Sequence, residues 1–453
     1  VPRKPRQGAI RHEIRAGIGN RGQRSLDFDS SGSISERLAY RIDASAERGD
    51  GWVDRGKHSS QGLTGTLQWQ FLPRWQLQLS HAEGRHKPMR YFGVPLIDGK
   101  PLEALRRTNY NVQDARITFR DHWSELTLQG SPSDNVAVRS RLYHIRSNRL
   151  WFDAENYTWD AARQQIRLAG DTAIRHHQKQ TGNTTDVTFD SKLLGMDNTI
   201  SAGFDLNHSS LQHDNNTYSG NPRYVSLLSP ETGFFDSDLP FIPRYRNTAD
   251  QYALFVEDRL AVTGQLSLVA GLRHDRVRIR RDDLITGSRA FSRTWNSTGH
   301  RLGAVYALTP TLSVYAQHSR AADPSTAPLM MSASGAKADM TIGRQIEVGI
   351  KQSLPQQRGE WTLAAYNITK HNLQSRDPAN PDNSLQVGKQ SSRGIEGTLS
   401  LALSSTLRLD ADATVLRARY DDFNDAVDGA IVSRSGNTPP DVPERLANPW
   451  LSW

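Results

Sequence analysis

The stretch from Gln251 to Arg278 constrains the fold most, because it carries two long segments of alternating chemistry joined by one short turn. In the first segment one side is apolar except at Asp258: Tyr252, Leu254, Val256 and Leu260. In the second segment the apolar side consists of Leu266, Leu268, Ala270 and Leu272. A period of two residues is typical of a β-strand whose two faces meet unlike environments. The stretch predicts a hairpin whose arms exceed the about 5–6 residues of an ordinary soluble strand.

The same alternation recurs along the chain and predicts roughly 17 complete strands, with one more beginning at Pro443. The clearest further strands are residues 38–46, 63–71, 75–79, 136–144, 200–208, 302–308, 312–318, 346–351, 361–367, 395–403 and 407–415. Short connections fall at residues 33–36, 72–74, 131–135, 262–265, 309–311, 354–359 and 404–406. Long polar connections fall at residues 85–111, 148–160, 213–247, 282–294, 322–341, 376–384 and 421–443. Loops sorted by length in this way favour an all-β fold, a transmembrane antiparallel up-and-down β-barrel with short periplasmic turns and long extracellular loops.

The composition agrees with such a barrel. Hydrophobic residues make up 36% of the 453 residues, charged residues make up 23%, and the mean hydropathy is −0.63. The chain is therefore too polar for a helical membrane protein, and no apolar run approaches the ~20 residues of a spanning helix. Its content of aromatic and branched residues argues against disorder. The absence of cysteine excludes disulfides and thiolate metal sites.

The net charge of +8 does not indicate a nucleic-acid-binding protein, because Lys and Arg are spread through the chain and alternate with apolar residues. Anionic lipid head groups and anionic ligands are compatible with this excess. Several large aromatic residues near strand ends fit either the aromatic girdles of a membrane barrel or ordinary packing: Trp52, Trp69, Trp75, Tyr306, Trp361, Trp450 and Trp453.

Several segments resemble the barrel of TonB-dependent outer-membrane siderophore receptors. The opening VPRKPRQGAIRHEIRAGIGNRGQRSLDFDSSGSISERLAYRIDAS looks like the junction between that family's plug and its first barrel hairpins. The mid-barrel pair is QYALFVEDRLAVT and LSLVAGLRHDR. Later pairs are RQIEVGIKQSLPQQRGEWTLAAYNITKHNL and VGKQSSRGIEGTLSLALSSTLRLDADATVLRARY, followed by VPERLANPWLSW. Together these segments cover nearly the whole chain.

The resemblance implies an outer-membrane receptor that captures a ferric siderophore and passes it through the barrel when TonB pulls on a plug domain. Such receptors close with about 22 strands, so residues 1–453 are expected to form about 17–18 of them, without the N-terminal plug and the last strands. Two sheet edges would then be unpaired. The implied partners are a ferric siderophore, outer-membrane lipid and lipopolysaccharide, and the TonB-ExbB-ExbD system acting through the plug. The implied location is the bacterial cell outer membrane.

No catalytic or metal-ligating constellation stands out, so neither an enzymatic activity nor a cofactor is expected. His176 and His177 are adjacent on a strand and point to opposite faces. The acidic pairs 282–283 and 421–422 lack the spacing of a helix-loop-helix calcium site. A passive porin, and an outer-membrane enzyme of the lipase or protease kind, remain as alternatives.

A siderophore already coordinates its iron, so its receptor needs aromatic walls and hydrogen-bond donors instead of iron ligands. Arginine would attract an anionic chelate. The candidate residues in the expected long loops are Arg90, Tyr91, Phe92, Arg149, Trp151, Phe152, Tyr157, Trp159 and Arg320. The competing interpretation is that these aromatic residues only pack the loops against one another.

The hairpin also fixes an expected orientation. Its turn belongs to the short-loop set and is therefore expected to be periplasmic. The side chains expected to face lipid are Leu254, Val256, Leu268 and Ala270. Those expected to face the lumen are Phe255, Glu257, Arg259 and Arg273. Asp258 fits the lipid face least well, although a position close to the turn would let it reach the membrane interface.

Overall fold

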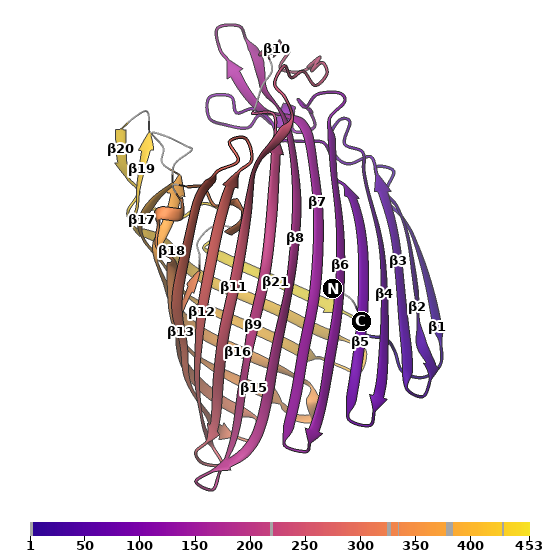
Figure 1. The fold of residues 1–453 in the computed structure, drawn as a ribbon, viewed down its shortest axis with the longest axis vertical. Coiled ribbons are helices and arrows are strands. Elements are labelled where there is room, and N and C mark those ends of the chain that lie inside the picture. Colours follow the sequence, from indigo (N-terminus) through magenta and orange to yellow (C-terminus); the bar gives the residue numbers. More distant parts are fainter. Residues whose placement is uncertain (1–2, 218–220, 324–327, 334, 377–383, 428–429) are drawn as a thin grey trace.

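The computed structural model describes residues 3–217, 221–323, 328–333, 335–376, 384–427 and 430–453. One sheet of 19 strands forms nearly all of the molecule, and a separate hairpin of β19 and β20 lies at one end (Figure 1). The strands are β1 (Arg11–Ile18), β2 (Arg24–Ser35), β3 (Leu38–Gly49), β4 (His58–Leu72), β5 (Trp75–Lys87), β6 (Arg116–Ser133), β7 (Val136–Asp160), β8 (Gln165–Leu193), β9 (Met196–Asn215), β10 (Arg223–Val225), β11 (Ile242–Ala261), β12 (Leu266–Asp283), β13 (Arg289–Thr309), β14 (Leu312–Asp323), β15 (Thr341–Leu354), β16 (Gly359–Arg376), β17 (Ser384–Ala402), β18 (Arg408–Asp422), β19 (Asn424–Val427), β20 (Ala430–Ser433) and β21 (Arg445–Ser452).

Helical structure in the described part of the chain is limited to four 3₁₀ turns: η1 (Glu103–Leu105), η2 (Pro328–Met330), η3 (Gly335–Lys337) and η4 (Pro355–Gln357). None of the described helices has the length and apolar character needed to cross a membrane.

The sheet has an up-and-down topology. Each long strand pairs antiparallel with the next one in the chain, β9 pairs with β11, and the short β10 adds to β8. Without β10 the sheet has eighteen strands, which confirms the predicted fold and strand number. The sheet curves so that β15, β16 and β21 pass behind β5 to β9 (Figure 1). Among the described residues β1 pairs only with β2 and β21 only with β18, so the sheet has two free edges.

The connections are sorted by length onto the two ends of the strands, and Figure 1 shows short turns at the bottom and long connections at the top. The predicted turn after β11 matches the structure, because β11 ends at Ala261 and β12 begins at Leu266. Two predicted long loops are wrong. Residues 148–160 lie within β7, and only residues 284–288 connect β12 to β13.

The β7–β8 hairpin explains the first of these errors. Its strands contain 25 and 29 residues and continue well beyond the length needed to cross a membrane. Aromatic and charged residues here fill both faces of a paired ribbon, so the simple apolar and polar alternation that marks a membrane strand disappears. The same alternation is lost near the long-loop end of most strands, so the sequence pattern underestimated how far these strands extend.

One face of the sheet carries a continuous exposed apolar band. Leu254 is 68% exposed, and its same-face neighbour Val256 and the residue opposite Val256, Leu272, are also exposed. The band runs through Ile14, Phe28, Ile42, Leu67, Leu79, Leu126, Leu142, Val187, Ile200, Leu206, Leu254, Val256, Leu268, Leu302, Ile346, Val348, Leu363, Ile395 and Val415. This apolar face is the outward, lipid-facing side of the barrel.

The inner face is polar, as predicted for the lumen. Arg273 lies over the ring of Phe255, at 5.9 Å from its centroid, and pairs with Asp275 at 2.9 Å. Glu257 lies 3.6 Å from Arg301 on β13. The predicted register of the hairpin is therefore correct.

Asp258 lies on the outward face near the short turn, where its carboxylate accepts a hydrogen bond from Asn198 Nδ2. This contact gives a hydrogen-bond partner to the carboxylate that interrupts the apolar run of β11.

Four of the predicted girdle residues occupy outward positions near the short turns: Trp69, Trp75, Tyr306 and Trp361. Trp69 and Tyr306 are half-exposed there, as expected of an interfacial belt. Trp52 does not belong to this belt. It lies in the loop before β4, and its ring packs against Tyr91 with the centroids 5.2 Å apart.

Candidate functional site

The long-loop end of the sheet is organised around the upper part of the β7–β8 hairpin. Residues 88–115 and 221–241 fold against it and bury two small apolar clusters. Ile166 and Leu168 on β8 pack with Tyr110 and Val225 in the first cluster. Ala154 on β7 packs with Val112 in the second. These contacts fix two long connections onto a rigid ribbon.

A row of aromatic rings and arginine side chains crosses the inner face of this end, over six neighbouring strands. We call it the inner ring row, and it consists of Phe119, Arg149, Trp151, His176, His213, Tyr245 and Arg281. The strand register builds it, because Phe119 lies opposite Arg149, Arg149 opposite His176, and His213 opposite both His176 and Tyr245.

The rings of the row contact one another in sequence. Centroids of Phe119 and Trp151 are 5.3 Å apart, and those of Trp151 and His176 are 5.2 Å apart. His176 and His213 follow at 5.0 Å, and Tyr245 stacks on His213 at 4.7 Å with an angle of 16° between the planes. Such distances are typical of favourable ring pairs.

A cation flanks each end of the row. The guanidinium of Arg149 lies 4.7 Å from the Phe119 centroid, and that of Arg281 lies 3.5 Å from the Tyr245 centroid. Arg149 also pairs with Asp121 at 3.3 Å. Ring faces between two guanidinium groups suit a flat, anionic ligand.

The two histidines of the row share a hydrogen bond, with Nε2 of His176 2.8 Å from Nδ1 of His213. Burial lowers the pKa of His176, and the nearby Arg149 lowers it further. Burial, with His176 and Arg281 as neighbouring cationic groups, lowers the pKa of His213 to about 4. The pair is therefore uncharged at neutral pH. Neither imidazole belongs to a three-ligand metal group in the described part of the chain.

Arg55 ties the loops above the hairpin together. Its Nη2 donates to the carbonyl oxygens of Asn109 at 2.6 Å and Asn111 at 2.8 Å, and its Nη1 donates to Thr232 Oγ1 at 3.1 Å. The Asn111 side chain in turn accepts from the backbone N–H of Ala154 at 3.0 Å. One arginine thus connects three separate loops to β7.

A buried ion pair holds the connection between β9 and β11. Asp171 is 1% exposed and receives both Nη atoms of Arg223, at 2.9 and 2.8 Å. Its Oδ2 also accepts from the backbone N–H of Asp236 at 2.7 Å. Bidentate geometry of this kind is the strongest that a carboxylate forms with a side chain.

Asp153 on β7 has no such partner. It is fully buried, and neither carboxylate oxygen has a hydrogen-bond donor among the described residues. Burial, with Glu155 and Asp171 nearby, raises its pKa to about 7. Burial likewise raises the pKa of Tyr157, and Asp153 and Glu155 raise it further.

The nine predicted ligand-binding residues divide into four groups. Arg149 and Trp151 lie in the inner ring row. Phe152, Tyr157 and Trp159 pack the loops against the hairpin, in line with the competing interpretation. Arg320 stands apart at an outward-facing position of β14, where it donates to the Thr298 carbonyl.

The remaining three predicted residues lie in the connection after β5. Arg90 donates through Nη1 to the Ala115 carbonyl oxygen at 3.2 Å, Tyr91 packs on Trp52, and Phe92 is 48% exposed. Burial raises the pKa of Tyr91. Only Phe92 of these three presents its ring freely to solvent.

The sequence did not identify Phe119, His213, Tyr245 or Arg281 as parts of one site. His213, Tyr245 and Arg281 fall on alternate positions of strands that extend further than predicted. Phe119 lies on β6, for which no strand bounds were predicted from the sequence. The row would have been found by continuing each strand upward and aligning the inner positions across the sheet.

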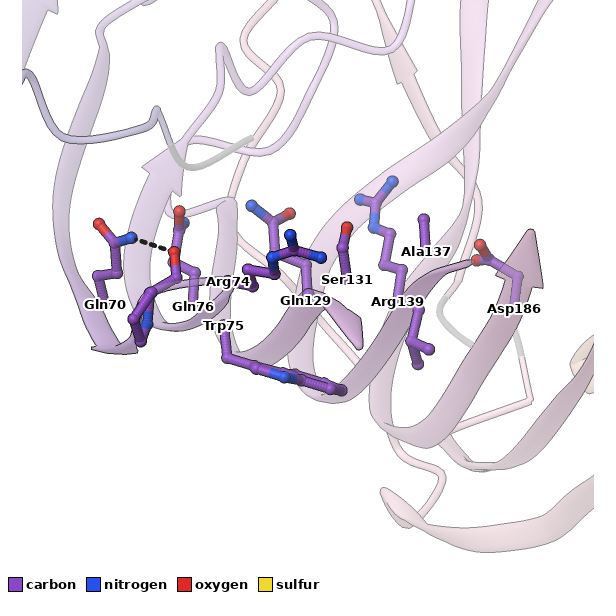
Figure 2. Close-up of a pocket in the computed structure, with 12 residues that line it drawn as sticks. Gln70, Arg74, Trp75, Gln76, Gln129, Ser131, Ala137, Arg139 and Asp186 are labelled. Atoms are coloured by element: carbon purple, nitrogen blue, oxygen red, sulfur yellow. Dashed lines mark hydrogen bonds between the residues drawn. The ribbon is translucent and has the colours of Figure 1, made fainter. Parts of the chain in front are cut away.

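The opposite end of the barrel has different chemistry. A hollow of about 510 Å³ lies near the short turns and is lined by Gln70, Arg74, Trp75, Gln129, Arg139 and Asp186 among others. Figure 2 draws these side chains. Arg139 and Asp186 lie opposite each other on β7 and β8. The amide and charged groups here contrast with the aromatic rings of the inner ring row at the long-loop end.

Comparison with known proteins identifies the fold and its relatives. A family model described as TonB dependent receptor-like, beta-barrel, matches residues 83–453. The metal-pseudopaline receptor CntO of Pseudomonas aeruginosa is 24% identical over 442 residues, covering 90% of this chain and 58% of that protein. The ferrioxamine B receptor of Salmonella typhimurium is 22% identical over 464 residues, covering 97% of this chain and 62% of that protein.

Among solved structures, the siderophore receptor PiuA from Acinetobacter baumannii aligns with a TM-score of 0.87 at 16% identity, over 99% of this chain and 70% of that chain. The chain therefore has the fold of these barrels. It spans about 60% of the length of the curated relatives named above.

Proposed function

The chain belongs to the TonB-dependent receptor β-barrel family, and from this premise we propose that it is the barrel of an outer-membrane receptor that captures a ferric siderophore at its long-loop end. The family and the relatives are bacterial outer-membrane proteins, and the outward apolar band of this chain meets the requirement for that location.

The inner ring row is the observation that carries the proposal. A ferric chelate has its metal satisfied and presents flat, often anionic organic groups, so it is recognised by ring faces and guanidinium groups. Trp151, His176 and Tyr245 supply the faces, and Arg149 and Arg281 supply the charges. The names of the relatives, which include ferrioxamine and metal-pseudopaline receptors, support a metal chelate as the ligand class.

Transport would require energy coupling through a plug domain. In the whole receptor, the TonB-ExbB-ExbD system would pull on that plug and open a path through the barrel lumen. The polar inner wall, with pairs such as Arg273 and Asp275, supports this role because a plug with a polar surface could slide along it.

Lipopolysaccharide is the proposed lipid partner. Arg85 lies directly opposite Arg120, and Arg146 lies directly opposite Lys179. All four side chains are exposed at outward-facing positions above the apolar band. Like charges in direct register destabilise a sheet unless an anion lies between them. Phosphate groups of the outer leaflet would supply that anion.

Two alternatives have distinct readouts. A passive porin would give steady conductance in a planar bilayer when the full-length protein is inserted, whereas a receptor would stay closed without TonB. A lipase or protease would hydrolyse esters or peptides in the absence of any iron chelate. No catalytic triad or dyad was predicted, and the family is one of transport receptors, so we expect no hydrolysis.

The site is tested by binding of ferric chelates of the hydroxamate, catecholate and citrate types to the full-length receptor in detergent. Trp151→Ala and Tyr245→Ala should each weaken the binding of the preferred chelate at least about tenfold, because each removes a stacking face. Isothermal titration calorimetry measures the affinities.

Arg320→Ala is the matched control, because Arg320 was also a candidate but faces outward on β14. It should leave the affinity unchanged. Wild-type affinity in both ring variants would exclude the inner ring row as the site. Failure of every chelate class to bind wild-type protein would contradict the proposed function itself.

A further inference from the structure

The outward face carries a group of three side chains that the siderophore site does not use. His81 and Glu83 are separated by one residue on β5, so they point to the same side, and His122 on β6 lies directly opposite Glu83. The three side chains lie just above Leu79 of the apolar band, at its long-loop edge. All three are solvent-accessible, so an ion from the medium could reach them.

The distances between their polar atoms are those between metal ligands. His81 Nε2 lies 3.4 Å from Glu83 Oε1, and His122 Nδ1 lies 3.3 Å from the same oxygen. One ligand atom from each residue lies within 4.8 Å of the others. Zinc bonds of about 2.0–2.1 Å in a tetrahedron place neighbouring ligand atoms about 3.4 Å apart. Both imidazole nitrogens are therefore already at this spacing from the carboxylate oxygen.

The strand geometry makes this arrangement rigid. Glu83 and His122 form a direct cross-strand pair, and His81 lies opposite Ser124, whose Oγ is 2.9 Å from His81 Nδ1. That contact leaves Nε2 of His81 directed at Glu83. A hydrogen bond to the second ring nitrogen is how ligating histidines are usually oriented.

We propose that His81, Glu83 and His122 form a site for a divalent transition-metal ion of the zinc class on the outer surface of the barrel. Two imidazoles and a carboxylate are ligands that such ions prefer over calcium and magnesium, which select oxygen ligands. Three protein ligands leave the fourth tetrahedral position open toward the outside.

An anionic oxygen fits the open position. Arg146 on β7 lies directly opposite His122, on the same outward face. A phosphate or carboxylate oxygen bound to the ion would therefore have a guanidinium beside it. Water would occupy the position otherwise. The ion would also connect β5 to β6 outside the backbone hydrogen bonds.

The site is tested with Zn²⁺ alone, using the full-length protein in detergent at pH 7.5. Calorimetry should detect one equivalent of Zn²⁺ that Glu83→Gln and His122→Gln each remove or weaken at least about tenfold. Co²⁺ in place of Zn²⁺ should give the visible absorption of a tetrahedral site in the wild type, and the two variants should lose it.

His144→Gln is the matched control, because His144 also faces outward at this level but contacts Thr181 instead of a carboxylate. The His144→Gln variant should still bind one equivalent of Zn²⁺ and should still give the visible absorption with Co²⁺. Far-ultraviolet circular dichroism establishes that each variant keeps its β-structure. No saturable Zn²⁺ binding to the wild type, or binding that both ligand variants retain, would overturn the proposal.

This result is separable from that of the chelate experiments. The three ligands lie on the outward face of β5 and β6, whereas the inner ring row lies on the opposite face. Loss of Zn²⁺ binding in Glu83→Gln should leave chelate affinity unchanged. Loss of chelate binding in Trp151→Ala should leave Zn²⁺ binding unchanged.

Discussion

His176 and His213 lie directly opposite each other on β8 and β9, with Nε2 of His176 2.8 Å from Nδ1 of His213. One shared proton forms this hydrogen bond between two neutral rings, whereas protonation of both rings would place two charged imidazoles against each other. The nearby guanidinium groups of Arg149 and Arg281 oppose protonation further. The arrangement therefore favours the neutral pair, and it makes the long-loop end sensitive to acid.

The first prediction concerns acid destabilisation through His213. Its folded-state pKa is lowered to about 4 from the ordinary histidine value of 6.5, so the unfolded chain binds the proton first as the pH falls. Its contribution to stability is complete above about pH 6.5 and is lost progressively down to about pH 4. The free energy of unfolding of the wild type should therefore fall over that window by an amount on the order of 1–3 kcal/mol that His213→Gln does not show, because Gln does not titrate.

Urea unfolding of the detergent-solubilised protein between pH 7.5 and 4.5 measures this effect. His208→Gln is the control, because His208 is exposed on the outward face and pairs with Asp250. A pH profile of His213→Gln identical to that of the wild type would contradict the prediction.

The second prediction has the opposite sign and concerns Asp153. Burial, Glu155 and Asp171 raise its pKa to about 7, so the folded protein holds a proton that the unfolded chain releases near pH 4. The protonated Asp153 carboxyl contributes to the free energy of unfolding below about pH 4, and this contribution is lost as the pH rises to about 7. Asp153→Asn should therefore be more stable than the wild type at pH 8, by roughly 1–3 kcal/mol, and the advantage should shrink at pH 5.

Unfolding by urea at pH 5 and pH 8 provides the comparison. The neutral amide keeps the size of the side chain while removing the buried charge, so a change in packing is not expected. A variant that is less stable than the wild type at both pH values would show that the Asp153 carboxylate is stabilised in the folded state after all.

The fold was predictable because the membrane imposes a simple pattern. Leu254 and Val256 had to face lipid, and Arg273 had to face the lumen, so alternation alone set the register of the hairpin. The sorting of short and long connections then gave the architecture. These signals are strong because every residue of a membrane strand meets either hydrocarbon or the polar interior.

The candidate site was predictable only in part, for a related physical reason. At the end of the β7–β8 hairpin that the long connections cover, both faces of the ribbon contact protein, so Trp151 and Trp159 looked alike in the sequence although one lies in the inner ring row and the other packs a loop. Partners such as Tyr245 come from strands far along the chain. Their assembly depends on cross-strand register, which a local pattern does not specify.

The same limit applies to the outward cluster. His81 and Glu83 have the i, i+2 spacing of ligands on one strand face, but His122 reaches them only through the pairing of β5 with β6. Metal ligands were therefore not expected from the sequence, and His122 is the residue that no spacing pattern pointed to.

The third prediction concerns the buried pair of Asp171 and Arg223. Asp171→Asn removes the bidentate contact and leaves the guanidinium without its carboxylate, a loss that costs about 3–5 kcal/mol for buried pairs. The lost stability should be local to the connection between β9 and β11, because Asp236 also donates its backbone N–H to Asp171. We expect limited proteolysis to cleave within residues 216–241 at least about tenfold faster.

Arg163→Ala serves as the control at the tip of the same hairpin. Arg163 pairs with Asp160 at 2.8 Å, but its side chain is 57% exposed, and exposed pairs contribute little. The rate of cleavage in residues 216–241 should not change. An equal increase in both variants would mean that the whole hairpin end, and not the Asp171 contact, controls access to the protease.

The last prediction tests the outward face directly. Leu254 lies between Tyr252 and Val256 in the apolar band, and its side chain is 68% exposed. Leu254→Arg would place a cation in the hydrocarbon, which costs about 2–4 kcal/mol at the bilayer midplane. Arg259→Leu on the inner face of the same strand is the control and should change stability much less, since the lumen tolerates either residue. The yield of folded, heat-modifiable protein in lipid vesicles measures the difference, and wild-type folding of Leu254→Arg would contradict the lipid-facing assignment of the band.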